Sequence, residues 1–427
     1  MANRLTFYIM IGLALGIITG AILHATVLDP AMLTLIGKWF GLVTTIFLRL
    51  IKMLIAPLVF ATLVSGIVHM GDTASLGRVG AKTIGWFLGA TVVSLTLGAI
   101  LVNWLQPGIG SGLILPPSDA TTDIVKPSSD FFTIIAELFP KSIFDAMATT
   151  TMLQIVIFSL FFGVAMTAIG EKAAPITKGV DALVQVMLQV TDYVMRMSPL
   201  AVFAAMAKVV AINGLWVLVT FAKFIGSFYF GLALLWILLG IAAFVVIGKR
   251  AGLLIRYIRE PILLAFSTAS SEAAYPRTLE ALDRFGIPPK IASFVLPLGY
   301  SFNLDGSMMY MTFASLFIAQ VYGINLSFGQ QASMLLILML TSKGMAAVPR
   351  ASLVVISGVM TQFHIPEAGL VLILAVDQFL DMGRSGTNVV GNAVATAVVA
   401  KWEGQLDEPT APEVEPPHAP SSHSHSA

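Results

Sequence analysis

The chain has 427 residues, of which 57% are hydrophobic and only 11% are charged. Soluble domains carry about 25% charged residues, so this composition excludes an ordinary soluble domain and indicates an all-α protein that crosses a membrane several times. The formal net charge of +1 argues against nucleic acid as a partner, and the lack of cysteine excludes disulfides, thiolate metal sites and cysteine nucleophiles.

The N-terminal segment has the basic start of a signal peptide, but its apolar run reaches the length of a membrane span and no clear A-x-A cleavage site follows. We therefore predict an uncleaved first span. Several apolar segments of the first 250 residues exceed the roughly 20 residues of a perpendicular crossing. The six predicted helices lie near residues 6–27, 40–70, 82–105, 145–169, 176–212 and 215–248.

The turn-rich segment 106–130 separates the third and fourth of these helices and predicts an aqueous loop. It holds three aspartates against one lysine, whereas basic residues follow the second and sixth spans. Cytoplasmic loops carry the excess of lysine and arginine. We therefore expect a cytoplasmic N-terminus and an external position for this loop.

After residue 250 the apolar segments become too short to cross and are interrupted by polar clusters. The first cluster is STASSEAAYPR at 267–277 and the second is TSKGMAAVPR at 341–350, and both contain A-A-x-P-R. Paired interrupted segments indicate a transporter's binding site, because non-helical backbone at membrane depth must be buried in protein or line a wet cavity. We predict two re-entrant hairpins, the first entering from the cytoplasm and the second from outside.

One long span, 291–322, is predicted between the two clusters, and it contains GYSFNLDGS at 299–307. Oxygen atoms of Asn303 and Asp305, with backbone carbonyls freed by Gly306, are hard ligands that suit Na⁺. Protonated, Asp305 could carry H⁺ instead. A structural bend with a capping aspartate is the alternative.

The last predicted span, 368–402, carries Asp377, Asp381, Arg384, Asn388 and Asn392 at spacings of four, three, four and four. At 100° per residue, these five side chains share an arc of about 80°. Each ionisable group at bilayer depth costs about 2.5–3.5 kcal/mol, so this face is expected to line a site for a charged ligand.

Asp381 and Arg384 are three residues apart, so they can neutralise each other when the site is empty. A ligand with both charges could exchange with that pair, since arginine binds carboxylates bidentately and Asp381 accepts from an ammonium. An acidic amino acid carries both groups. The alternative interpretation is a permanent ion pair that joins helices.

The first hairpin offers Ser270 and Ser271, whose backbone amides could receive a substrate carboxylate at the end of a half-helix. Glu272 either faces water or is a protonatable group in the pathway. A membrane enzyme with a serine nucleophile would need a nearby base, and no histidine lies within 260–350. A passive channel is disfavoured because paired opposite charges bind tightly and slow permeation.

The tail, 404–427, is rich in Pro, Glu, Ser and His and cannot bury enough apolar area to fold. We expect it to be disordered and cytoplasmic. Weak metal binding by His418, His423 and His425 is the alternative, and no other metal site is expected.

Four ordered motifs, STASSEAAYP, NLDGS, SKGMAAVP and DMGRSGTNVVGN, resemble the dicarboxylate/amino acid:cation symporters, the glutamate transporter family. The resemblance covers about residues 5 to 404 and is strongest to bacterial proton-coupled glutamate/aspartate symporters. It implies eight spans plus two hairpins, a homotrimer, no cofactor and an elevator mechanism. The implied scaffold is about 1–75 and 140–212, the implied transport core is about 78–105 and 215–403, and the hairpins are about 252–286 and 326–366.

The resemblance also implies roles for individual residues. Arg384 would bind the substrate's side-chain carboxylate, Asp381 its amino group, and Asn388 with Ser271 its main-chain carboxylate. The second hairpin, around Gly344–Pro349, would be the external gate. The full substrate set is Arg384, Asp381, Asn388, Ser270, Ser271, Ser307, Val348 and Pro349, and the coupling set is Asp305, Asn303, Gly299, Asn392 and Glu272.

Departures from the family pattern bear on the coupling ion and the substrate. Sodium-coupled members typically carry an aspartate at the position of Asn392, so its absence favours protons. The presence of Asp381 favours amino acids, whereas Arg350 in the gate favours a more anionic ligand. We expect a glutamate/aspartate:proton symporter of a bacterial inner membrane; a C4-dicarboxylate symporter and sodium coupling are the alternatives.

Overall fold

A computed structural model describes residues 2–27, 29–70, 73–110, 136, 139–214, 221–342 and 351–408. Within these ranges the chain is helical and has no strand. The helices are α1 (Ala2–Thr26), α2 (Pro30–Met70), α3 (Thr73–Leu105), α5 (Ile143–Ala148), α6 (Met152–Ile169), α7 (Ala174–Met195), α8 (Ser198–Asn213), α10 (Ala222–Ile247), α11 (Arg250–Thr268), α12 (Tyr275–Phe285), α13 (Pro289–Phe302), α14 (Asp305–Val321), α15 (Phe328–Thr341), α16 (Ala351–Gln362) and α17 (Leu370–Trp402). Short 3₁₀ turns are η1 (Gly170–Ala173), η2 (Glu272–Ala274) and η4 (Glu367–Gly369).

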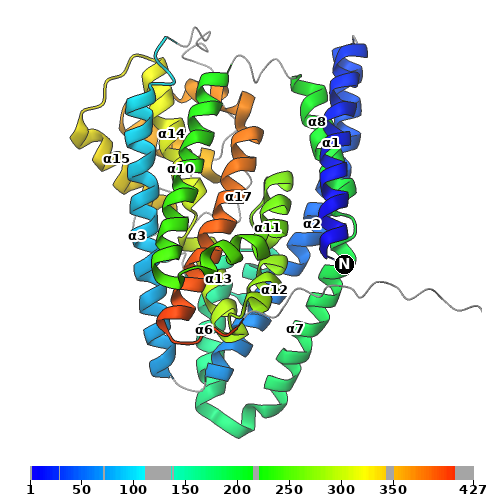
Figure 1. The fold of residues 1–427 in the computed structure, drawn as a ribbon, viewed down its shortest axis with the longest axis vertical. Helices are drawn as coiled ribbons and strands as arrows, with labels where there is room; N and C mark the ends of the chain where they lie inside the picture. The colour runs from blue at the N-terminus through cyan, green and yellow to red at the C-terminus, as the bar shows by residue number, and fades with distance from the viewer. Residues whose placement is uncertain are drawn as a thin grey trace, which may run out of the picture.

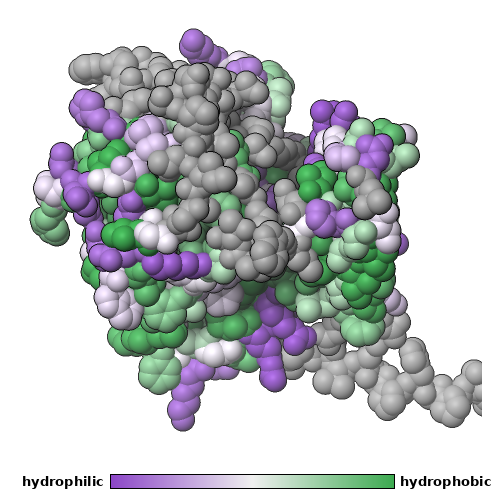
Figure 2. Space-filling model, turned by 90° about the horizontal axis from the view of Figure 1, so that it is seen from above, coloured by the Kyte–Doolittle hydropathy of each residue, from purple (hydrophilic) through white to green (hydrophobic). Residues whose placement is uncertain are grey.

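The prediction of an all-helical membrane protein is confirmed. Five segments of the described chain are long and apolar enough to cross a bilayer: Phe7–Thr26, Pro30–Phe47, Leu76–Leu105, Leu153–Met195 and Ala222–Ile247. Large apolar side chains are exposed along these helices, and hydrophobic residues cover much of the outer surface seen in Figure 2. Such a surface is soluble in lipid rather than in water.

The helices form two groups (Figure 1). In one group, α1 packs along α8, and α2 packs against α6, α7 and α8. In the other, α17 packs against α10, α11 and α14, and α3 packs against α14. Because α13 contacts both α2 and α17, it lies where the two groups meet.

Two predicted single helices are each broken in the structure. The segment predicted as one helix at 176–212 is divided into α7 and α8, because Pro199 in the first turn of α8 has no N–H to continue the preceding helix. The segment predicted at 145–169 is divided into α5 and α6, and Thr150 between them has a positive φ of 56°. Hydropathy did not reveal either break because both sides are apolar.

The span predicted at 291–322 is also interrupted, and this break positions the site. The helix stops at Phe302 and resumes at Asp305, so Asn303 and Leu304 have non-helical backbone. The prediction of one continuous helix was therefore wrong. The break lies just before Gly306, which the sequence had indicated as a point of bending.

Both interrupted segments contain pairs of helices. The first is α11 and α12, which pack on each other and are joined through η2. The second is α15 and α16, which also pack on each other. The residues that connect this second pair, 343–350, lie outside the described part of the chain, as does most of the loop predicted at 106–130.

The chain just beyond α17 packs against the first hairpin instead of leaving the protein. Asp407 donates its backbone N–H to the carbonyl of Gly286 over 2.9 Å. The Arg250 guanidinium donates to the Phe285 carbonyl over 3.1 Å and also to the Asp407 carbonyl. The predicted tail therefore begins too early at 404, and its part from 409 onward lies outside the described residues.

Candidate functional site

The polar face of α17 lies inside the protein. Asp377, Asn388 and Asn392 are buried, while the side chains of Asp381 and Arg384 are 19% and 18% exposed. The predicted arc thus brings its five members to one side of the helix, against α14 and α16. The only partly accessible members among them are the two that form an ion pair.

That ion pair joins Asp381 Oδ1 and Arg384 Nε across one turn of α17. The guanidinium also donates from Nη1 to the hydroxyls of Ser307 and Ser352, at 3.0 Å each. Ser307 belongs to α14 and Ser352 to α16. One cation therefore connects three helices and is paired with the Asp381 carboxylate.

Asn388 joins α17 to the start of α14. Its Oδ1 accepts from the backbone N–H of Gly306 at 2.9 Å and of Ser307 at 3.2 Å, and its Nδ2 donates to Ser307 Oγ at 3.1 Å. Asn388 thus occupies two of the N–H groups at the N-terminus of α14 that would otherwise attract an anion. An alanine methyl at position 306 would overlap the Arg384 carbonyl, so this close approach of the two helices requires glycine.

A second buried polar cluster surrounds the break between α13 and α14. Asn303 Nδ2 donates to Asp305 Oδ2 and to Asn392 Oδ1, both at 3.2 Å, and Ser94 of α3 donates to Asp305 Oδ1 at 3.3 Å. Asn303 and Asp305 are fully buried. Asn303 Oδ1 and Asn392 Nδ2 have no hydrogen-bond partner among the described residues.

Gly299 lies beside this cluster, since a methyl group there would overlap Asn392 Oδ1. The cluster contains side-chain oxygens of Asn303, Asp305 and Asn392, but those of Asn303 and Asn392 belong to neutral amides. Asp305 is therefore the one carboxylate among these three residues. Among the described residues, no group of three or more metal-ligating side chains is arranged to hold a metal ion.

Asp377, which had no assigned role, accepts a hydrogen bond of 2.6 Å from the hydroxyl of Tyr310. The Arg384 guanidinium lies 6.0 Å from the centre of the same ring. Tyr310 thus links Asp377 to the Asp381–Arg384 ion pair.

The first hairpin brings its serines to the junction of α11 and η2. Ser270 Oγ accepts from the backbone N–H of Ala273 at 3.3 Å, so this hydroxyl caps the following turn. Ser270, Ser271 and Glu272 are half-buried, and α11 packs along α17. No hydrogen bond within the described chain joins Ser270 or Ser271 to Arg384.

Some candidate residues are outside the described chain, and others were not foreseen. Val348, Pro349 and Arg350 lie outside the described chain. Ser94, Tyr310 and Ser352 contact the site but were missed, and the sequence around Ser94 and Tyr310 gives no sign of it. A polar residue in the first turn after the A-A-x-P-R motif was the available signal for Ser352.

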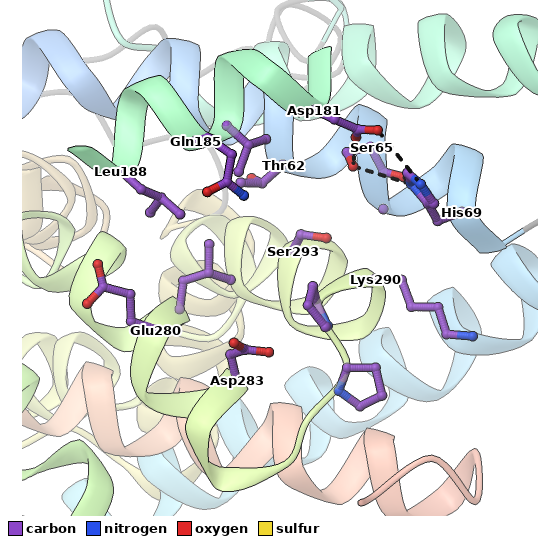
Figure 3. A pocket seen from close by; sticks show the side chains of 15 residues that line it. Thr62, Ser65, His69, Asp181, Gln185, Leu188, Glu280, Asp283, Lys290 and Ser293 are labelled. Carbon is purple, nitrogen blue, oxygen red and sulfur yellow. Dashed lines mark hydrogen bonds and ion pairs between the residues drawn. The ribbon is translucent and has the colours of Figure 1, made fainter. Parts of the chain in front are cut away.

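A cavity of about 540 Å³ lies elsewhere, between α2 and α7 on one side and α12 and α13 on the other (Figure 3). On one wall, Ser65 donates to Asp181 at 2.6 Å, and His69 lies 3.8 Å from the same carboxylate. Glu280 and Lys290 belong to the other wall. None of the residues of the α17 face lines this cavity, so it is separate from the candidate site.

Comparison with known proteins identifies the family. The profile of the sodium:dicarboxylate symporter family matches residues 5–402. A proton/sodium-glutamate symport protein of Bacillus caldotenax is 40% identical over 417 residues, covering 95% of this chain and 96% of that protein. A proton/glutamate-aspartate symporter of Escherichia coli (strain K12) is 40% identical over 412 residues, covering 94% of each chain.

Relatives with another substrate in their names are nearly as similar. A C4-dicarboxylate transport protein of Agrobacterium fabrum is 39% identical over 368 residues, covering 85% of this chain and 82% of that protein. All three relatives are named for transport, and the family consists of symporters and not of enzymes. This integral membrane protein belongs to the sodium:dicarboxylate symporter family.

Proposed function

We propose that this protein imports glutamate or aspartate together with protons by an elevator mechanism. The observation that carries the proposal is the Asp381–Arg384 pair, which is partly accessible and set among buried polar groups. An ammonium can take the place of the guanidinium on Asp381, while a carboxylate takes the place of Asp381 on Arg384. The ammonium and one carboxylate of an acidic amino acid make both exchanges, and neither Asp381 nor Arg384 is then left unpaired.

Further contacts support the substrate assignment. Ser307, in the first turn of α14, accepts a hydrogen bond from Arg384, and the positive end of that helix favours an anion beside the guanidinium. Within the proposal, Ser270, Ser271, Val348 and Pro349 from the two hairpins complete the site, and the second hairpin is the external gate. Two relatives named for glutamate are 40% identical to this chain.

Proton coupling is proposed because the cluster at the α13–α14 break lacks a second carboxylate. Asn392 is neutral, so within the described part of the chain Asp305 is the single acid that accepts a hydrogen bond from Asn303. Na⁺ bound there would meet less negative charge than two carboxylates provide. The candidate proton carriers are Asp305, Asp381 and Glu272.

Uptake by proteoliposomes tests both parts of the proposal. We expect labelled aspartate or glutamate to accumulate under an inward pH gradient without Na⁺, and Arg384→Gln to abolish this uptake. Uptake that requires a Na⁺ gradient and ignores pH would contradict proton coupling. A C4-dicarboxylate transport protein is 39% identical to this chain, so succinate is the competitor to use; transport of succinate but not aspartate would establish that second candidate.

We also propose that the protein acts as a homotrimer with both termini in the cytoplasm of a bacterium, and that α1, α2 and α5–α8 form the scaffold. In this arrangement the group that contains α3 and α10–α17 moves against the scaffold. Cysteine cross-links between α2 and α13, which are in contact, should form in one transport state and decrease in the other. Cross-linking at the same efficiency under all conditions would contradict the elevator movement.

A further inference from the structure

The Arg384 guanidinium is held on two of its three nitrogens by side chains from three helices. Nε donates to Asp381 of α17, and Nη1 donates to Ser307 of α14 and to Ser352 of α16. Nη1 carries two N–H groups, and the two serine hydroxyls, both at 3.0 Å, accept them. Nη1 is therefore fully occupied in the structure.

This occupation limits how a carboxylate can bind. A bidentate carboxylate takes two parallel N–H groups from adjacent nitrogens of the guanidinium. With Nη1 held by the serines, the edge that is left is formed by Nε and Nη2, and Nη2 has no hydrogen bond to any described residue. Nε becomes available only when Asp381 releases it.

Release of Asp381 requires a new partner for that carboxylate. The ammonium of an amino acid supplies one, because it donates to Asp381 as the substrate carboxylate binds the Nε–Nη2 edge. A dicarboxylate such as succinate has no cationic group, so its binding on this edge would leave Asp381 as an unpaired, mostly buried charge. The geometry thus discriminates by the presence of the ammonium.

We propose that Ser352 is a specificity-determining positioning residue, which restricts the substrate carboxylate to the Nε–Nη2 edge and so rejects ligands without an ammonium. This inference rests on the proposed function of the site. Ser307 alone does not hold Nη1, since its hydroxyl is shared with Asn388 Nδ2 at 3.1 Å. Ser352 is 3% exposed, so water does not readily replace it.

Removing the hydroxyl should let the guanidinium turn and offer Nη1 with Nη2, an edge that a carboxylate can occupy while Asp381 stays bound to Nε. We therefore expect Ser352→Ala to strengthen succinate binding relative to aspartate. The loss of one hydrogen bond to a charged group corresponds to about a tenfold change. The ratio of the succinate inhibition constant to the aspartate KM should fall by about that factor.

The test measures this ratio in proteoliposomes for the wild type, Ser352→Ala, Ser352→Thr and Ser357→Ala. Threonine keeps the hydroxyl and should restore the wild-type ratio. Ser357 is also buried on α16 and is the matched control, because the described hydrogen bonds of Arg384 go to Asp381, Ser307 and Ser352 and not to Ser357. Since a ratio does not depend on how much protein is folded, a partly unstable variant remains informative.

The outcomes separate the two levels of the argument. A wild type that transports neither amino acids nor dicarboxylates overturns the proposed function and this inference with it. A wild type that prefers aspartate, with an unchanged ratio in Ser352→Ala, overturns the inference alone. An equal fall of the ratio in Ser357→Ala would also overturn it, because the effect would then be a general property of α16.

Discussion

Replacing Asp381 by asparagine tests the charge exchange most directly. The amide keeps the shape of the side chain and an oxygen that can accept from Arg384 Nε, but it removes the negative charge that balances the guanidinium. The substrate ammonium then loses its charged acceptor, while the substrate carboxylate keeps Arg384. Amino acids and dicarboxylates should therefore respond in different ways.

The magnitude follows from the contact that is lost. A hydrogen bond to a charged group contributes about 1.5–3 kcal/mol, which corresponds to about a 10- to 150-fold loss of aspartate affinity. Asp381 is 19% exposed, so solvent screens the interaction only in part. Succinate makes no contact that requires the charge of Asp381, and it should bind Asp381→Asn at least as well as the wild type.

The assay is competition of labelled aspartate and of labelled succinate uptake in proteoliposomes. Asp283→Asn is the control, because this exposed carboxylate on α12 loses the same charge away from Arg384. An aspartate KM within about twofold of wild type in Asp381→Asn would refute the recognition model. A parallel loss of both substrates would indicate a structural ion pair instead.

Two further predictions concern the end of α17. Burial raises the pKa of the Glu403 carboxyl, but hydrogen bonds from Lys82 and Arg78 outweigh it, so that its pKa lies below the ordinary value of 4.5. The ionised Glu403 contributes under about 1 kcal/mol to the free energy of unfolding, because Arg78 is half exposed. This stabilisation is complete above pH 4.5 and is lost as the pH falls through the lower pKa of the folded state. Thermal unfolding in detergent should show this loss at acid pH in the wild type and not in Glu403→Gln. Gly286 has a φ of +97° and no room for a methyl group beside the chain that follows α17, so Gly286→Ala should destabilise by at least about 1 kcal/mol, while Gly252→Ala, in open space on α11, should not.

The α17 face could be predicted from the sequence because all of its members belong to one helix. Helical periodicity alone places Asp381 and Arg384 within one turn of each other, and it also places Asn388 and Asn392 on the same side. The structure has the ion pair that this spacing predicts. The prediction depended on local geometry and needed no knowledge of the tertiary fold.

The partners supplied by other helices could not be predicted in this way. Ser352 lies 32 residues from Arg384 and Tyr310 lies 67 residues from Asp377. Which residue of α16 or α14 faces α17 depends on the packing of whole helices, to which a single serine or tyrosine contributes little. The role of Asp377 stayed open at the sequence level for this reason, since its partner Tyr310 lies in an apolar, methionine-rich helix.

The helix breaks were missed because apolar sequence on both sides masks them. A window of hydropathy cannot distinguish one tilted helix from two shorter ones joined at an angle. At Asn303 the break is stabilised by tertiary contacts, since its amide donates to Asp305 and to Asn392 of a different helix. These contacts replace backbone hydrogen bonds that the interruption leaves unmade.

Asn392 offers a test of the coupling ion that does not depend on transport. Asn392→Asp would put a second buried carboxylate next to Asn303 and Asp305, replacing an amide nitrogen that has no partner within the described chain. Two carboxylates that both approach Asn303 repel each other and destabilise the protein unless one is protonated or a cation binds.

Oxygen ligands with two negative charges suit Na⁺, and Na⁺ at 100 times its Kd would stabilise the folded state by about 2.7 kcal/mol. Thermal unfolding of Asn392→Asp should therefore respond to Na⁺ but not to the same concentration of K⁺, and the wild type should respond to neither. A wild type that Na⁺ already stabilises would mean that one carboxylate is sufficient for the ion, and proton coupling would then lose its main structural support.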